Sequence, residues 1–64
     1  MGNERWARYY VRTFQWYSDA ELETFINRCT EDMTTVRSVI NPWSDSQTGK
    51  SGATFLFEKM EEDE

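Results

Sequence analysis

The chain has 64 residues, of which 38% are hydrophobic and 30% are charged, and its formal net charge at neutral pH is −5. This length accommodates one domain, and an aromatic content of 16% argues against disorder, because disordered chains contain few aromatic residues. The acidic balance excludes a general DNA-binding domain, and the absence of histidine removes the commonest metal ligand and the usual base at neutral pH.

The first predicted element is a strand over residues 5–16, which have the sequence RWARYYVRTFQW. Three arginines and five aromatic residues occupy these positions, and no glycine or proline interrupts them. Aromatic and β-branched residues are enriched in strands, so an extended conformation is expected here.

A helix is predicted next, because the spacing of apolar residues changes after Ser18. Ser18 is a favoured N-cap residue, and Glu21, three positions later, completes a capping box. Apolar residues then recur at positions i, i+3, i+4 and i+7, which predicts one apolar face on a helix of about three turns. The residues of this apolar face are Leu22, Phe25, Ile26 and Cys29.

Two further strands are predicted after the helix. Residues 32–41 return to β-branched side chains, and this strand is expected to stop at Pro42, because proline cannot donate to a strand ladder. Residues 44–52 are polar and include two glycines, which predicts a long hairpin loop. Residues 53–60, ATFLFEKM, form the third predicted strand, and the acidic residues 61–64 are expected to be an unordered tail.

These elements define the predicted fold class. The sequence predicts a single small α+β domain over residues 1–60, followed by a disordered acidic tail over residues 61–64. The element order is β-α-β-β, with one helix packed on a three-stranded, mainly antiparallel sheet.

Alternation along the first strand divides its side chains between two faces, with Arg8 and Arg12 on the same face as Tyr10. One helix covers only one face of a small sheet, and arginines are seldom buried without partners, so the helix is expected to cover the opposite face. The predicted core consists of Tyr9, Val11, Leu22, Phe25, Ile26, Cys29, Val36, Ile40, Phe55 and Phe57. The predicted uncovered face consists of Trp6, Arg8, Tyr10, Arg12, Phe14, Arg37, Val39, Trp43 and Leu56.

The predicted uncovered face is the candidate binding site, because large exposed apolar patches mark interaction surfaces. Tryptophan, tyrosine and arginine are also the residue types enriched in binding hot spots. The candidate partner- or ligand-binding residues are Trp6, Arg8, Tyr10, Arg12, Phe14, Arg37 and Trp43. We expect a small non-enzymatic interaction protein that docks on a protein partner, which it inhibits or modulates, and that also forms a homo-oligomer.

Other functions remain open for the same residues. Arginine grips phosphate and aromatic rings stack on bases, so the face suits capture of a nucleotide, another anionic ligand or a short nucleic acid. A face that serves only to form an oligomer, and an acidic protein that mimics DNA, are further alternatives. In general character the chain is similar to small bacteriophage or mobile-element proteins that interfere with host factors.

The sequence offers no constellation for catalysis, and no cofactor or metal is expected. The stretch TGKSG, residues 48–52, ends like a phosphate-binding loop, but Ser44 stands where that motif needs glycine and a strand follows it. Cys29 has no histidine to activate it and lies on the apolar face of the helix.

One cysteine permits no internal disulfide, so a cytoplasmic location is expected. The longest apolar runs are too short to cross a membrane.

Overall fold

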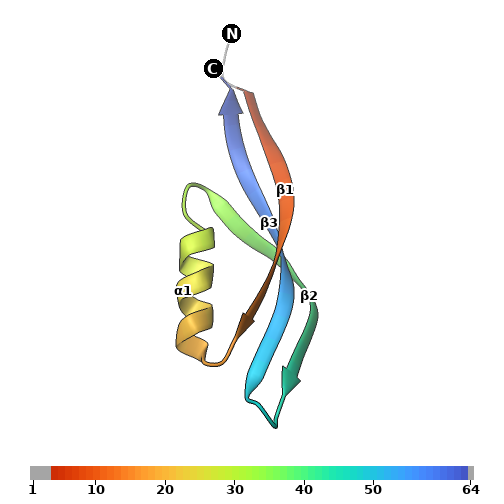
Figure 1. Cartoon of the computed structure of the whole chain (residues 1–64). Helices are drawn as coiled ribbons and strands as arrows, with labels where there is room; N and C mark the ends of the chain where they lie inside the picture. Colours follow the sequence, from red (N-terminus) through yellow and green to blue (C-terminus); the bar gives the residue numbers. More distant parts are fainter. Residues whose placement is uncertain (1–3, 64) are drawn as a thin grey trace.

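The computed structural model describes the backbone of residues 4–63 and the side chains of residues 6–61. Four elements follow one another along the chain: β1 (Glu4–Trp16), α1 (Asp19–Cys29), β2 (Thr34–Asp45) and β3 (Lys50–Asp63). The strands form one antiparallel sheet in the order β1-β3-β2, and α1 lies against one face of it (Figure 1). The predicted α+β fold and its element order are confirmed.

The Ser18 cap predicted at the start of α1 is present, but the capping box is only half formed. The Ser18 hydroxyl accepts a hydrogen bond from the Glu21 N–H at 3.3 Å, and the Glu21 carboxylate accepts one from the Tyr17 N–H at 2.8 Å. The second bond therefore goes to the residue before the cap. At the other end, Thr30 donates to the Ile26 carbonyl from its N–H and from its hydroxyl, which ends the helix.

Strand β2 does not stop at Pro42 as expected, but continues to Asp45. Two irregularities interrupt its register with β3, one between Val36 and Ser38 and one between Ile40 and Trp43. Because β2 is an edge strand and Pro42 falls within the second irregularity, the missing N–H costs no regular ladder bond. The predicted long loop accordingly shrinks to a tight turn between β2 and β3.

Strand β3 is longer than predicted, because it includes residues 61–63, which were expected to be an unordered tail. These residues pair with the first part of β1, where Glu61 lies opposite Trp6. The Glu61 carboxylate also lies 3.3 Å from the Arg8 guanidinium. The acidic segment is therefore extended beside a segment that bears the opposite charge. Glu64 lies outside the described residues.

The register between β1 and β3 decides which side chains meet the helix. Residues opposite one another in an antiparallel pair point to the same face. Tyr10 lies opposite Phe57 and Phe14 lies opposite Ala53, so the even-numbered residues of β1 share the face on which β3 carries its buried residues. Phe25 of α1 stacks on Phe14 and contacts Phe57, which places the helix over this face.

The predicted facing of β1 was therefore wrong. Tyr9 is 58% exposed and Val11 is 51% exposed on the face opposite the helix, whereas Tyr10 and Phe14 pack against the core. Ile40, also predicted in the core, is 38% exposed. The arginines of β1 need no burial on the helix side, because β1 is an edge strand from which long side chains reach solvent.

The remaining predicted core residues pack as expected. The buried apolar side chains on β3 are Ala53, Phe55 and Phe57. Around them pack Val36, Trp16 and the apolar face of α1, which consists of Leu22, Phe25, Ile26 and Cys29 as predicted. Leu56 lies opposite Val11 on the face away from the helix, as expected.

The molecule is long and thin. Its Cα atoms extend over 57 × 20 × 11 Å, and their radius of gyration is 14.8 Å. A compact domain of this length has a radius of gyration of about 11 Å. The excess arises because β1 and β3 continue as a two-stranded ribbon beyond the end of α1 (Figure 1). The helix therefore covers only part of one face.

Replacement of Phe57 by alanine is expected to lower the free energy of unfolding by about 3–5 kcal/mol, because this ring is completely buried. Urea denaturation followed by circular dichroism measures the loss. Leu56→Ala, one residue away on the opposite face, is the control and is expected to cost clearly less. Equal losses for the two variants would contradict the assignment of the faces.

Candidate functional site

Strand β1 forms an unpaired edge of the sheet. In the part of the chain that the structure describes, its only strand partner is β3. The β1–β3 ladder runs without a bulge or a proline, whereas the other edge, β2, carries two register shifts and Pro42. Bulges and prolines protect strand edges from pairing with other chains, so β1 is the less protected edge.

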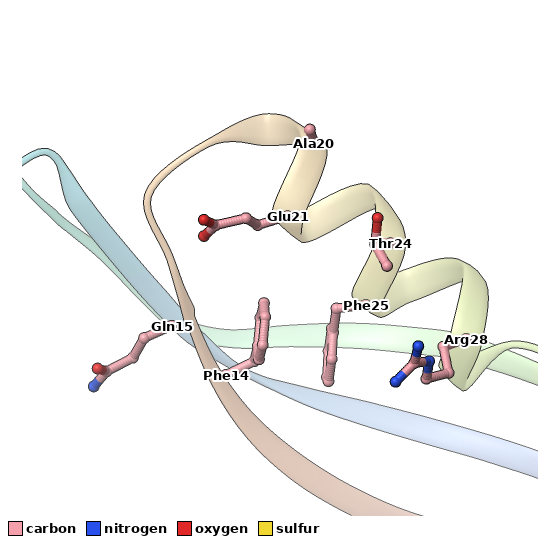
Figure 2. A pocket seen from close by; sticks show the side chains of 7 residues that line it. All are labelled: Phe14, Gln15, Ala20, Glu21, Thr24, Phe25 and Arg28. Atoms are coloured by element: carbon pink, nitrogen blue, oxygen red, sulfur yellow. The ribbon is translucent and has the colours of Figure 1, made fainter.

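A groove of about 620 Å³ lies between β1 and α1, and we call it the strand–helix groove. Figure 2 shows Phe14 from β1 and Phe25 from α1 side by side in it. Their rings are parallel within 2°, with centroids 4.0 Å apart. The residues that line the groove are Phe14, Gln15, Ala20, Glu21, Thr24, Phe25 and Arg28. Because adjacent residues of β1 point to opposite faces, the presence of both Phe14 and Gln15 shows that the groove reaches the outer edge of β1.

The strand–helix groove carries opposite charges at its two ends. Glu21 lies in the first turn of α1 and Arg28 in the last turn, seven residues later. This separation corresponds to about 10 Å along the helix axis. Phe14 and Phe25 supply an apolar floor between these two charges. The shape suits an extended segment with an apolar side chain at its centre.

A second hollow, of about 440 Å³, is lined by three cations and one aromatic ring. We call it the basic hollow, and its residues are Arg8, Tyr10, Arg12 and Lys59. Arg8 lies directly opposite Lys59 in the register, and like charges in directly opposed positions destabilise a sheet. Glu61 offsets part of this repulsion through its ion pair with Arg8.

The Tyr10 ring is held between two neighbours in the basic hollow. It stacks on Phe57 with centroids 5.3 Å apart, and the Arg12 guanidinium lies 4.9 Å from its centroid. Arg12 also donates from Nη1 to the Val11 carbonyl at 3.0 Å. These contacts position the Tyr10 ring and favour one placement of the Arg12 guanidinium.

The sheet face away from α1 is the third surface, and we call it the open face. Its apolar side chains are Tyr9, Val11, Ile40, Trp43 and Leu56. Polar contacts cross this face: the Thr13 and Thr54 hydroxyls lie 2.9 Å apart, and Glu58 contacts both the Tyr9 hydroxyl and the Arg37 guanidinium at 3.3 Å. Trp43 lies against Gly52, where a Cβ atom would approach the indole within 2.5 Å.

The structure divides the seven predicted site residues between two faces. Five of them lie on the helix side of β1, namely Trp6, Arg8, Tyr10, Arg12 and Phe14. Arg37 and Trp43 lie on the open face, so the prediction that all seven share one uncovered face was wrong. The reversed facing of β1 is the cause: Arg37 and Trp43 lie away from the helix, as predicted, whereas the even-numbered residues of β1 lie on the helix side.

Several residues of these surfaces were not predicted. Lys59 joins Arg8 because the register pairs them, and Arg28 reaches the strand–helix groove from α1. The sequence was sufficient to place Lys59 on the helix side of the sheet. Phe57 was expected to face the helix, and Lys59 follows it by two residues. The partners of Lys59 across the sheet depend on the register, which the alternation alone does not determine.

Comparison of the chain with protein-family models, with curated proteins and with solved structures finds no match. No helix among residues 4–63 is long and apolar enough to span a membrane. Over the same residues, no three histidine, cysteine, aspartate or glutamate side chains are grouped so that they could hold a metal ion. Cys29 is half-buried and packs against the core.

Lys59→Gln is expected to raise the free energy of unfolding by a few tenths of a kcal/mol at low salt, because it removes the like charge opposite Arg8. Glu61→Gln is expected to lower it by a similar amount, because it removes the ion pair with Arg8. Urea denaturation at low and at high salt measures both effects, and both should diminish at high salt. A destabilised Lys59→Gln variant would show that Lys59 is a stabilising residue.

Proposed function

We propose that this chain is a small non-enzymatic interaction protein that docks on a partner protein and modulates it, with β1 as the docking strand. The observation that carries the proposal is the unpaired edge of β1 beside the strand–helix groove. An extended segment of the partner adds to this edge as a fourth strand, and its backbone hydrogen-bonds to β1.

The side chains of the partner segment supply specificity in this proposal. Alternate residues of an added strand point toward the helix side, where one apolar side chain enters the groove above Phe14 and Phe25. The charges of Glu21 and Arg28 select the groups that flank that side chain. Trp6 and Arg8, on the same side of β1, extend the contact with residue types that are common in binding hot spots.

The proposal includes no catalytic step. The chain lacks histidine, and its one thiol packs against the core of the domain. A free cysteine in a small domain without a disulfide suits a reducing compartment, which supports the cytoplasm as the place of action.

Thr24→Arg is expected to block the strand–helix groove, because Thr24 lines it from the exposed surface of α1. Asn27→Arg is the matched control, since it adds the same charge to an exposed position of the same helix outside the groove. Peptides selected from a random library on the wild-type chain should bind Asn27→Arg equally and should bind Thr24→Arg at least about tenfold more weakly.

Circular dichroism should show that both arginine variants keep the fold. In the wild-type complex, peptide binding should also slow hydrogen exchange at amides of β1, because added strand hydrogen bonds protect them. Equal peptide affinity for the wild type and Thr24→Arg, or a lack of new protection in β1, would contradict docking at this edge.

The open face favours a second function, which is self-association. The described part of the chain has only three buried apolar side chains, whereas Tyr9, Val11, Ile40 and Trp43 remain 38–58% exposed. We propose that a second copy covers this face, with the two sheets packed face to face. Arg37 and Glu58 neutralise one another on this face, so two copies can approach without repulsion between like charges.

Val11→Glu is expected to abolish this self-association, because it places a charge at the centre of the open face. Native mass spectrometry and light scattering should show a wild-type dimer and a Val11→Glu monomer. Asn27→Glu, which changes the exposed surface of α1 by the same charge, should remain dimeric. A wild-type chain that is monomeric at every concentration measured would refute this second function.

A further inference from the structure

We propose that the basic hollow binds a nucleoside polyphosphate, with the phosphates between Arg8, Arg12 and Lys59 and the base on the indole of Trp6. The basic hollow shares no lining residue with the strand–helix groove or with the open face, although Trp6 and Arg8 also lie along the docking edge of β1. The inference therefore does not depend on the proposed docking function.

The distribution of charge is the first argument. The whole chain has a net charge of −5, yet three of its seven basic residues line one hollow. The register also sets Arg8 directly opposite Lys59, an arrangement that costs stability when nothing lies between the two charges. An anion bound in the hollow turns this repulsion into attraction to a shared ligand. A phosphate group with more than one negative charge suits three cations better than a carboxylate does.

The geometry of the arginines is the second argument. A guanidinium group has five N–H donors in a planar fork that matches phosphate oxygens. Arg12 donates from Nη1 to the Val11 carbonyl and lies against the Tyr10 ring, and these contacts favour a position of its guanidinium at the hollow before a ligand arrives. Arg8 contacts Glu61 through a single exposed ion pair at 3.3 Å, which is the weak kind of ion pair that a phosphate can displace.

An exposed aromatic ring on the same face of β1 as Arg8 indicates the rest of the ligand. Tyr10 is held between Phe57 and Arg12, so its ring is not the platform for a base. Trp6 lies on the same face of β1, two residues before Arg8, and is 47% exposed. Two residues of a strand span about 7 Å, which suits the distance between a base and its phosphates. Stacking on an indole is the ordinary way in which proteins hold a base without a specific pocket.

The size of the hollow and the charge of the protein favour a single nucleotide over a long nucleic acid. A volume of about 440 Å³ lies in the range of small-molecule sites. The basic residues form one local cluster, and the acidic remainder of the chain repels the extended backbone of a polynucleotide.

The test is a titration of the full chain with ADP, inorganic pyrophosphate and adenosine, followed by calorimetry and by amide chemical shifts. ADP is expected to bind most tightly, pyrophosphate more weakly, and adenosine without measurable affinity. Arg12→Gln and Lys59→Gln should each weaken ADP binding about tenfold or more, because each removes charged hydrogen bonds to phosphate. Trp6→Ala should weaken binding of ADP but leave binding of pyrophosphate unchanged.

Lys50→Gln is the matched control, because it removes the same charge from the opposite end of β3 and should leave ADP affinity unchanged. Absence of ADP binding to the wild-type chain would overturn the proposal, and so would an equal loss in Lys50→Gln and Lys59→Gln. Equal affinity for ADP and pyrophosphate, unchanged in Trp6→Ala, would overturn the assignment to a nucleotide. Thr24→Arg, which blocks only the strand–helix groove, should bind ADP normally even if docking along β1 is disproved.

Discussion

The antiparallel pairing of β1 with β3 is the constraint on which the other features depend. It extends without interruption over the 13 residues of β1, and it puts Tyr10 opposite Phe57 and Phe14 opposite Ala53. Through these pairs it decides which rings lie beneath α1 and which remain on the open face. A shift of one residue in the register would move every side chain of β1 to the opposite face of the sheet. The same pairing brings Lys59 to Arg8 and so creates the basic hollow.

The small size of α1 is the second feature that determines which surfaces are exposed. A helix of 11 residues is about 16 Å long, whereas the sheet runs along a molecule of 57 Å. One face of the sheet is thus left open and the ribbon of β1 and β3 projects past the helix. Strand β1 borders the strand–helix groove, the basic hollow and the open face, because it lies at the edge where these three surfaces meet.

Local signals in the sequence predicted the elements well. Ser18 and Glu21 predicted the start of the helix, and the spacing of Leu22, Phe25 and Ile26 predicted the side that packs on the sheet. Such signals act within a few residues of chain, so neighbouring residues suffice to predict them. Phe55 was also assigned correctly to the core, and the structure buries it on the central strand beneath α1.

Features that depend on residues far apart in the sequence could not be predicted from such local signals. Tyr9 and Val11 were placed under the helix because Arg8 and Arg12 were expected to avoid it, yet an edge strand lets arginines reach solvent from either face. The irregularity between Val36 and Ser38 reversed the alternation in β2, and no local motif marked its position. Val39 therefore lies opposite Phe55 on the helix side and Ile40 lies on the open face, the reverse of the prediction. The acidic residues 61–63 became part of β3 because β1, far away in sequence, provided their partner.

Nuclear Overhauser contacts between ring protons in the full-length chain test the pairing of β1 with β3 most directly. The structure predicts contacts of Tyr10 with Phe57 and of Phe14 with Phe25, whose ring centroids lie 5.3 Å and 4.0 Å apart. Contacts of Tyr9 or Val11 with the apolar face of α1, in place of these, would contradict the register and the surfaces that follow from it.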